Sequence, residues 1–586
     1  MTSELEPDTG SASPSSVDPP KAAAPRPSGA RFVAFGIMSS KIFGLLREMA
    51  YSRFLGVGPH TDVLRQAFKA PNLLQNLLGE QTLSAAFIPI YSRMLEEGRE
   101  EDAGRFAGAV FGLLVLVVAT LVTLGIVFAP WIVAVLSPGF LGDAEAVAAG
   151  TKEIDRYALL VKVVRLVFPM TGFMVLAAWT MGILNSHRRF VLPYMAPAFW
   201  NICLLSGLFA AAAQRGKLWT PAGADSDDAT ALLYGICFGA VVGGLMQFLV
   251  QLPLVLKLSR GLRVSISTRI DGVRDSFKAL GPALAGRGVV QFSLYIDMIL
   301  ASFLAAGAPS AINFASTLIN LPLGVFGMSV AAAELPELSR QGPEQARHAM
   351  AQRIRAAMKQ SSFLILPSVV GYLCFGYLVV SLLYRGGQFG VASIWLVWAV
   401  LGCYALGLPA STLSRLMQNS FFALRDTRTP ALIAIVRLVA SATLGLFWML
   451  HLDTQSVASF MQRLSGFPML ETDLTTGQEL FMGACGLAAA AGVGSWAELA
   501  LLIWCLKRRL PELRLPLGRI VVFASASVAA AVPCVVLWFQ LRNQHHAVQS
   551  LAVLGTFAVL YLAAAWLTRA PELDMWLGRL QRRRSS

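Results

Sequence analysis

Charged and amide side chains recur every three or four residues within one otherwise apolar stretch of the chain. The members are Asp62, Arg65, Lys69, Asn72, Asn76 and Glu80. Since an α-helix has about 3.6 residues per turn, this spacing predicts one polar face on a helix whose other faces are apolar. The stretch before it adds Lys41, Arg47, Glu48 and Arg53. Cations outnumber anions here, which favours an electropositive chamber for a phosphate or pyrophosphate, because arginine binds phosphate through two donors and lysine as a point charge.

The elements that carry these residues are predicted to lie in a membrane. Of the 586 residues, 55% are hydrophobic and only 14% are charged, whereas about a quarter of the residues in a soluble domain are charged. Apolar stretches of roughly 18 to 20 residues, long enough to span a bilayer, recur along the chain. We therefore expect an all-α polytopic membrane protein with about fourteen transmembrane helices. They are expected near residues 31–56, 62–90, 105–130, 157–184, 190–213, 229–256, 279–306, 310–337, 361–384, 391–423, 430–451, 479–506, 518–541 and 548–568.

The distribution of basic residues indicates topology rather than nucleic-acid binding. The formal net charge is +14, but the basic residues lie between apolar segments and form no patch with interleaved aromatic residues. The loops that follow from a cytoplasmic N-terminus hold most of the Lys and Arg, so the positive-inside rule predicts that both termini are cytoplasmic. Residues 1–29 are rich in Pro, Ser, Ala and acidic residues and carry no signal-peptide pattern, which predicts a disordered cytoplasmic tail.

An internal repeat divides the predicted helices into two halves. Residues 67–79 align with residues 315–327, and residues 185–193 align with the basic turn at 423–430. The predicted lobes are residues 30–258 and 259–507, each with six helices in parallel orientation, and residues 508–586 add two helices and a basic cytoplasmic C-terminus. Parallel repeats around a central cavity are an architecture of transporters.

The second half repeats the polar face without its charges. The corresponding residues are Asn313, Ser316, Thr317 and Asn320. We therefore expect them to line the substrate path opposite a cationic first lobe. Arg287 and Asp297 on the seventh predicted helix and Arg415 on the tenth are candidates for pairing with one another, for gating, or for binding a coupling cation.

A structural role is the alternative for the charges of the first two helices. A charge at the bilayer centre costs roughly 3 kcal/mol or more, so these side chains are expected to face the interior of the bundle or a wet cavity. Glu48 paired with Arg47 or Lys41, and Asp62 paired with Arg65, would lock helices together without binding any ligand. The excess of cations favours the functional interpretation.

No motif points to an enzyme. The sequence has no HExxH, no GxSxG elbow, no P-loop and no GxGxxG motif, and its six histidines are scattered. The seven cysteines lie in or beside apolar segments and form no CxxC pair, so buried thiols are expected. We predict no catalytic residues, no cofactor and no metal site.

The N-terminal region resembles the MviN/MurJ family of lipid II flippases. The segments that carry the resemblance are Ser40-Lys-Ile-Phe-Gly-Leu-Leu-Arg-Glu48, Arg53-Phe-Leu-Gly56, Ala67-Phe-Lys-Ala-Pro-Asn-Leu-Leu74, Ala86-Phe-Ile-Pro-Ile90 and, later in the chain, Asp426-Thr-Arg-Thr-Pro430. The resemblance implies the fourteen-helix fold of the multidrug/oligosaccharidyl-lipid/polysaccharide exporter superfamily in a bacterial inner membrane. It also implies that lipid II is exported by alternating access, with its pyrophosphate in a cationic central cavity and its polyprenyl tail in a groove bordered by the last two helices.

The resemblance assigns individual residues and also reveals departures. Arg47 matches a cavity arginine of the family, Asp62 and Glu80 match acidic positions, and Lys41 stands where relatives commonly have arginine. Near the inner end of the second helix this chain has Gln75 instead of arginine, and Ser316-Thr317 replace an Asp-Arg pair. The sodium ligands of some relatives are not evident on the eleventh helix, so sodium coupling does not carry over.

Other functions remain open from sequence. The same fold could carry another lipid-linked oligosaccharide, or exchange a drug-like cation for ions, although the latter would favour an acidic chamber. A non-transporting scaffold that recruits cell-wall synthesis enzymes is a third hypothesis. The expected partners are the lipid-linked anionic precursor and the bilayer, with no nucleic acid, and the protein is expected to be a monomer.

Overall fold

The protein is an all-helical, multi-pass membrane protein. The computed structural model describes residues 27–79, 83, 86–221, 225–276, 278, 295–331, 343–424, 426–463, 479–568 and 572–573. Within these ranges, 10 helices are long and apolar enough to cross a membrane, or 11 if a pair bent by 102° at residues 129–148 is one span. The helical membrane architecture is thus confirmed, while the count of about fourteen stays a prediction. The predicted tail, residues 1–29, lies almost wholly outside the described residues.

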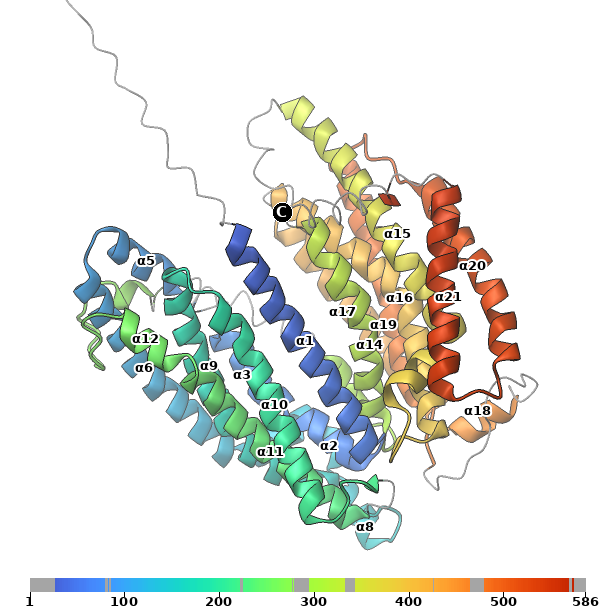
Figure 1. Ribbon diagram of the computed structural model, residues 1–586, viewed down its shortest axis with the longest axis horizontal. Coiled ribbons are helices and arrows are strands. Elements are labelled where there is room, and N and C mark those ends of the chain that lie inside the picture. The colour runs from blue at the N-terminus through green and yellow to red at the C-terminus, as the bar shows by residue number, and fades with distance from the viewer. Residues whose placement is uncertain are drawn as a thin grey trace, which may run out of the picture.

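The helices of the first half pack beside one another (Figure 1). They are α1 (Pro27–Leu55), α2 (Pro59–Ala67), α3 (Lys69–Leu78), α5 (Ile88–Glu96), α6 (Glu100–Val127), α7 (Ala129–Leu136), η1 (Pro138–Phe140), α8 (Asp143–Ala148), α9 (Arg156–Ser186), α10 (Val191–Gln214), α11 (Ser226–Leu249) and α12 (Leu252–Leu258). We call them the first group. Their buried hydrophobic residues form two clusters, one around α2, α9 and α11 and one around α5 and α6.

The helices of the second half form a second group, which begins with a helical segment at residues 295–302. It continues with α14 (Ala308–Ala331), α15 (Pro343–Tyr384), α16 (Val391–Ala423), α17 (Arg428–Leu452), α18 (Val457–Arg463), α19 (Gly483–Arg509), α20 (Leu517–Gln540) and α21 (His546–Leu567). Its largest hydrophobic cluster joins α14, α15, α16 and α19 with the last two helices. Each group therefore has a core of its own, although the lobe boundaries at residues 258 and 507 stay predictions.

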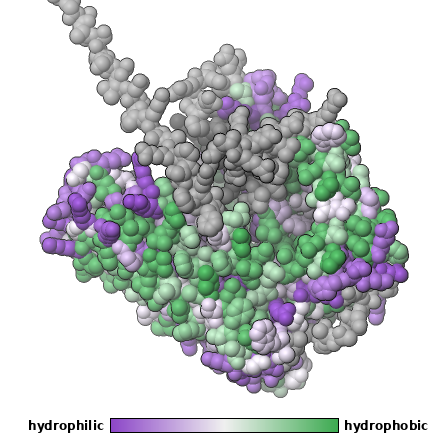
Figure 2. Space-filling view, in the orientation of Figure 1, coloured by the Kyte–Doolittle hydropathy of each residue, from purple (hydrophilic) through white to green (hydrophobic). Residues whose placement is uncertain are grey.

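The distribution of hydrophobic residues on the surface supports a location in the membrane. Figure 2 shows hydrophobic residues over a broad band of the visible face, with hydrophilic residues gathered at its rims. Many large apolar side chains are exposed on the protein, including Trp131, Phe447 and Trp566. Such a contiguous apolar surface is expected where lipid replaces water.

The predicted helix over residues 62–90 is wrong as a single element. It is divided into α2, α3 and α5. Pro71 has no amide hydrogen to donate to the carbonyl of Ala67, which weakens the helix at the α2–α3 junction. The next helix ends at Leu78, and Gly79 adopts an extended conformation. The polar face predicted from Asp62 to Glu80 is therefore interrupted.

The turn between α16 and α17 explains one quoted motif by local structure. The carboxylate of Asp426 accepts hydrogen bonds from the backbone N–H of Arg428 and from both the N–H and the hydroxyl of Thr429. These bonds lower the pKa of Asp426 to about 2. Because the acceptor stabilises amides at the first turn of α17, this segment starts a helix.

Candidate functional site

A buried carboxylate on α1 binds two arginines. Glu48 is 2% exposed. It accepts hydrogen bonds from both terminal nitrogens of Arg65 on α2, one of them at 3.1 Å, and from Nη2 of Arg47 at 2.8 Å. Nη1 of Arg47 donates to the side-chain oxygen of Asn201 on α10 at 3.0 Å. Since one carboxylate faces two guanidinium groups, this arginine pair keeps a net positive charge.

Aromatic rings pack against both arginines of the pair. The guanidinium carbon of Arg65 lies 5.4 Å from the ring centre of Tyr51 and 5.0 Å from that of Phe314 on α14. That of Arg47 lies 5.4 Å from the ring centre of Trp200. Such contacts stabilise a cation without neutralising it. Phe314 belongs to the second group, so the arginine pair lies where the two groups meet.

Arg47 and two further cations of the first two predicted helices, Lys41 and Lys69, lie on α1 and α3. The side chain of Arg47 is 21% exposed, and Lys41 is exposed on α1. Lys69 is half-buried at the start of α3, within electrostatic range of Arg65 and Asp297. Together these residues give the space between α1 and α3 a positive potential.

A cavity of about 410 Å³ opens beside these cations inside the first group. Lys41 of α1 and Asn76 of α3 line it. Gln75, at the position where the family resemblance implied arginine, lines it as well. Two of the predicted binding residues, Lys41 and Asn76, therefore line the cavity. Asn72 is half-buried on α3.

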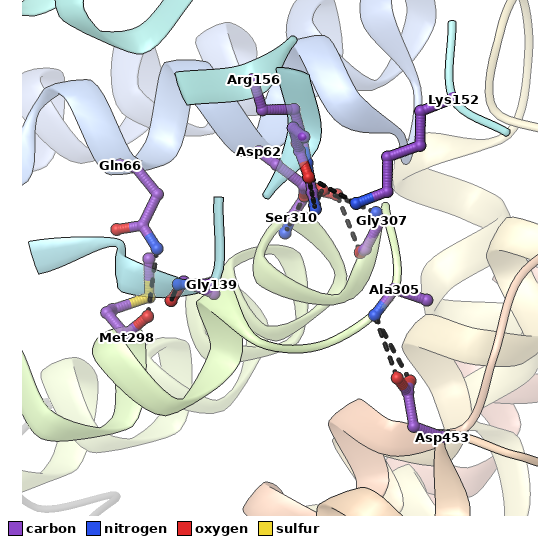
Figure 3. A network of polar contacts seen from close by, with 12 residues as sticks. Asp62, Gln66, Gly139, Lys152, Arg156, Met298, Ala305, Gly307, Ser310 and Asp453 are labelled. Carbon is purple, nitrogen blue, oxygen red and sulfur yellow. Dashed lines mark hydrogen bonds and ion pairs between the residues drawn. The ribbon is translucent and has the colours of Figure 1, made fainter. Parts of the chain in front are cut away.

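Asp62 has a different environment, at the contact between the two groups (Figure 3). It is 0% exposed. Its carboxylate oxygens accept hydrogen bonds from the backbone N–H of Gly307 at 2.6 Å and of Ser310 at 2.9 Å, and Arg156 lies 3.9 Å away. The N-terminus of α14 carries a partial positive charge that favours such an anion. Asp62 therefore offers no surface to a ligand in this conformation and instead joins the groups.

Further polar contacts cross between the groups at the same end. The side-chain amide of Gln66 donates to the carbonyl of Met298 at 3.0 Å, and the backbone N–H of Gln388 donates to the carbonyl of Arg53 at 2.9 Å. Gly387 has φ +59, and a Cβ there would overlap the carbonyl oxygen of Arg53, so only glycine allows this approach. We call these contacts, with those of Asp62, the interlobe seam. Arg53 contributes its backbone to the seam, and its side chain is exposed.

The predicted residues of the second half are dispersed. The hydroxyl of Thr317 donates to the carbonyl of Asn313 within α14, at 3.0 Å, and Asn320 and Arg415 are exposed. Ser316 of α14 lies near Tyr404 of α16. Asp297 lies within electrostatic range of Lys69 and Arg437. Glu80 and Arg287 lie outside the described residues.

Comparison with known proteins shows to which family the chain belongs. The family model described as "Lipid II flippase MurJ" matches residues 51–462, which is more than half of the 586 residues. The chain belongs to the MurJ family. The resemblance inferred from sequence is thereby confirmed.

Individual relatives agree with this assignment. The chain is 31% identical over 428 residues to the "Probable lipid II flippase MurJ" of Rhizobium meliloti, which covers 72% of this chain and 75% of that protein. It is 29% identical over 406 residues to the "Lipid II flippase MurJ" of Burkholderia cenocepacia, covering 69% and 74%.

Solved structures show the same fold. A structure described as "Lipid II flippase MurJ, inward closed conformation" matches with a TM-score of 0.68 at 20% identity, over 92% of this chain and 98% of that one. An inward-facing multidrug resistance MATE family transporter of the MOP superfamily matches with a TM-score of 0.55 at 15% identity, over 83% and 98%. These likenesses show that this MurJ family member shares the fold of both structures.

A second cavity in this MurJ family member is largely apolar. It measures about 330 Å³ and lies between α15 and α21. Phe363, Pro367 and Gly371 line it from α15, and Leu554 and Phe557 line it from α21. Its walls suit a hydrocarbon chain.

Sequence reasoning missed an acidic residue of the second group. Glu498 on α19 is 1% exposed. Its carboxylate accepts hydrogen bonds from Arg437 of α17 at 2.9 Å and from the side-chain amide of Gln418 of α16 at 2.8 Å. A lone acid within an apolar helix is a signal that sequence offers, because an ionisable residue in a membrane span requires a partner.

Replacing Glu498 with Ala is expected to destabilise the protein by about 1–3 kcal/mol, because it leaves Arg437 and Gln418 without their shared acceptor. Thermal unfolding of the purified protein in detergent measures the loss. Glu512→Ala is the matched control, since the side chain of Glu512 is 54% exposed. Equal unfolding temperatures for both variants would show that the buried pair contributes nothing to stability.

Proposed function

We propose that the protein moves lipid II, a polyprenyl-pyrophosphate-linked peptidoglycan precursor, from the cytoplasmic to the outer leaflet of a bacterial inner membrane. Membership of the MurJ family supports this cargo, since the family and the relative from Burkholderia cenocepacia are both described as lipid II flippases. The observation that carries the proposal within this chain is the arginine pair, in which one carboxylate, Glu48, is shared by Arg47 and Arg65.

The chemistry of the arginine pair suits a pyrophosphate. A phosphate oxygen accepts charge-assisted hydrogen bonds from guanidinium groups, often two from one arginine. Arg47 is the partly exposed member, so a ligand approaching from the side of Lys41 meets it first. An uncompensated cation in a poorly hydrated site binds an anion strongly, because water does not screen the attraction. The apolar cavity between α15 and α21 is the proposed path of the polyprenyl tail.

Alternating access is the proposed mechanism, and the interlobe seam supports it. The seam lies at the C-terminal end of α1, so with a cytoplasmic N-terminus it closes the outer side of the protein. The carboxylate of Asp62 can release the amides of Gly307 and Ser310 without breaking a helix. Opening of this seam, with closure at the other end, would present the bound head group to the outer face.

The experiment that tests the function is complementation of a strain depleted of its lipid II flippase, read out as exposure of labelled precursor at the outer surface. Arg47→Ala and Lys41→Ala are each expected to lower exposure at least tenfold, because losing a charge-assisted phosphate contact costs about 1.5–3 kcal/mol. Arg105→Ala is the control, since its side chain is 54% exposed on α6. Absence of rescue by the unaltered protein would refute the cargo, and full exposure with both variants would refute the cationic site.

A different lipid-linked oligosaccharide is the second candidate cargo. The observation that favours it is the presence of Gln75 in the cavity wall, where the family resemblance implies arginine. Competition between lipid II and other polyprenyl-pyrophosphate glycans in reconstituted vesicles separates the two cargoes.

A further inference from the structure

A third cavity opens between α10 and α11, which lie side by side (Figure 1). It measures about 710 Å³, within the roughly 300–1,000 Å³ that is usual for a small-molecule site. Its walls are one face of each helix, since the lining residues recur every three or four positions. They include Gly207, Ala211 and Gln214 of α10 and Asp227, Ala231 and Phe238 of α11. Phe238 is 63% exposed, so the cavity is a groove on the outside of the bundle.

The floor of this groove is formed by backbone. A Cβ on Gly207 would lie 2.2 Å from the carbonyl oxygen of Gly235, and a Cβ on Gly235 would lie 2.6 Å from that of Ala211. The two helices therefore touch directly, as small residues allow in membrane proteins. Because glycine and alanine carry no long side chain, space remains open above the contact. Close packing explains the depth of the groove, but it does not explain the charges at one end.

The end of the groove at the α10–α11 connection carries both signs of charge. Arg215, directly after α10, and Asp227 of α11 both line it. The carboxylate of Asp228 lies 3.8 Å from Nη1 of Arg215 and 3.3 Å from Nζ of Lys217. Since two cations share this one buried carboxylate, part of their positive charge stays uncompensated. The side chain of Arg215 is 48% exposed, and Asp227 is exposed beside it, so both charges are accessible from the groove.

The length of the groove matches one leaflet of a bilayer. Asp227 and Phe238 are eleven residues apart on α11, a rise of about 16 Å, and half of the hydrocarbon core is about 15 Å. Trp219, in the connection at the charged end, is 87% exposed, and tryptophan is enriched at the membrane–water interface. The charges thus lie at the level of lipid head groups, and Phe238 lies near the centre of the membrane. With a cytoplasmic N-terminus, this is the outer leaflet.

The lining restricts the kind of lipid. A guanidinium group such as that of Arg215 binds a phosphate through charge-assisted hydrogen bonds. An exposed carboxylate such as that of Asp227 binds an ammonium group, which donates three hydrogen bonds. The apolar remainder of the groove suits an acyl chain. A phospholipid of the ethanolamine class carries all three groups, with its phosphate and amine joined by a short linker, whereas a phosphatidylglycerol lacks the amine.

We propose that the groove between α10 and α11 is a binding site for a zwitterionic phospholipid of the outer leaflet. Arg215 binds its phosphate, Asp227 binds its amine, and one acyl chain lies over the glycine–alanine floor. The head group then links the end of α10 to the start of α11. This inference goes beyond the proposed function and does not depend on the cargo.

The test uses the delipidated full-length protein in detergent, titrated with phosphatidylethanolamine or with phosphatidylglycerol of identical acyl chains, and native mass spectrometry measures each dissociation constant. Phosphatidylethanolamine is expected to bind about tenfold more tightly. Asp227→Asn, which keeps the shape of the side chain, is expected to remove this preference and to leave phosphatidylglycerol unchanged. Arg215→Ala is expected to weaken both lipids about tenfold, while Lys217 remains as the partner of Asp228.

Controls separate the groove from the rest of the lipid-facing surface. Arg542→Ala removes an exposed arginine just after α20, at the same side of the membrane, and Glu153→Gln changes an exposed acid in the connection before α9. Neither is expected to alter lipid binding. Ala210→Leu places a larger side chain in the groove and is expected to weaken both lipids without any change of charge.

Three results would overturn the inference: equal affinity for the two lipids, an unchanged preference in Asp227→Asn, or equal losses in Arg215→Ala and Arg542→Ala. The unfolding temperature of each variant without added lipid verifies that the protein is folded. Arg47→Ala, which tests lipid II transport, is expected to bind phosphatidylethanolamine normally. A failure of the flippase proposal would therefore leave this binding site intact, and the converse also holds.

Discussion

Replacement of Glu48 with Ala is expected to prevent the protein from accumulating in the membrane. The change leaves Arg47 and Arg65 close together without their shared carboxylate, and Arg65 is 8% exposed. Breaking a buried ion pair by removing one partner costs about 3–5 kcal/mol, which is a large part of the 5–15 kcal/mol that stabilises a typical fold. The amount of membrane-inserted protein and its unfolding temperature in detergent measure the effect.

A second change distinguishes buried charge from simple loss of packing. The double variant Glu48→Ala with Arg65→Met removes one of the two cations, so it is expected to regain part of the lost stability. Glu97→Ala serves as the control, because the side chain of Glu97 is 46% exposed in its pair with Arg99. A Glu48→Ala variant as stable as the control would contradict the proposed net charge of the arginine pair.

Replacement of Asp62 with Ala is expected to open the interlobe seam and to abolish transport. Asp62 accepts two backbone hydrogen bonds from the N-terminus of α14, and hydrogen bonds to a charged group each contribute about 1.5–3 kcal/mol. Their loss shifts the equilibrium between closed and open seams by at least tenfold. Val57→Cys provides a reporter of seam opening, since Val57 is 1% exposed and packs in the hydrophobic core of the second group.

The measurement is the rate at which a membrane-impermeant maleimide, added from outside, labels the cysteine at position 57. The rate is expected to rise at least tenfold when Asp62→Ala is added to Val57→Cys. Asp102→Ala is the comparison, because its side chain is 44% exposed. Equal labelling with and without Asp62 would mean that other contacts keep the seam closed.

Hydrophobic patterning predicted most of the fold, because a membrane span needs a long apolar helix and little else. The same reasoning failed over residues 62–90, where Pro71 and Gly79 interrupt the helix despite its polar periodicity. Local spacing also placed Asp62 and Arg65 correctly in the interior of the bundle.

Pairing partners were harder to predict, since they come from distant parts of the chain. Asp62 was a candidate partner for Arg65, yet it binds backbone amides 245 and 248 residues away. Arg65 instead shares Glu48 with Arg47. A backbone amide carries no sequence signal, so only the packing of α2 against α14 reveals this role.

The lining of the cavity beside Lys41, which includes Gln247 and Gln251, shows a second limit of sequence. Glutamines within apolar helices are common enough that Gln247 and Gln251 do not stand out. What distinguishes Gln251 is an acceptor left without a donor, which depends on coordinates. Glu498, by contrast, was detectable, because it is the single acidic residue between Gly483 and Arg509.

Val57 belongs to the chain of the first group but packs in the hydrophobic core of the second. Separation of the groups at the seam would wet this side chain, and burying a valine is worth about 1.5–3 kcal/mol. Burial of Val57 therefore favours the closed seam. In the proposed alternating-access mechanism, opening of the outer side has to overcome this cost, and the same burial favours the return to the closed form.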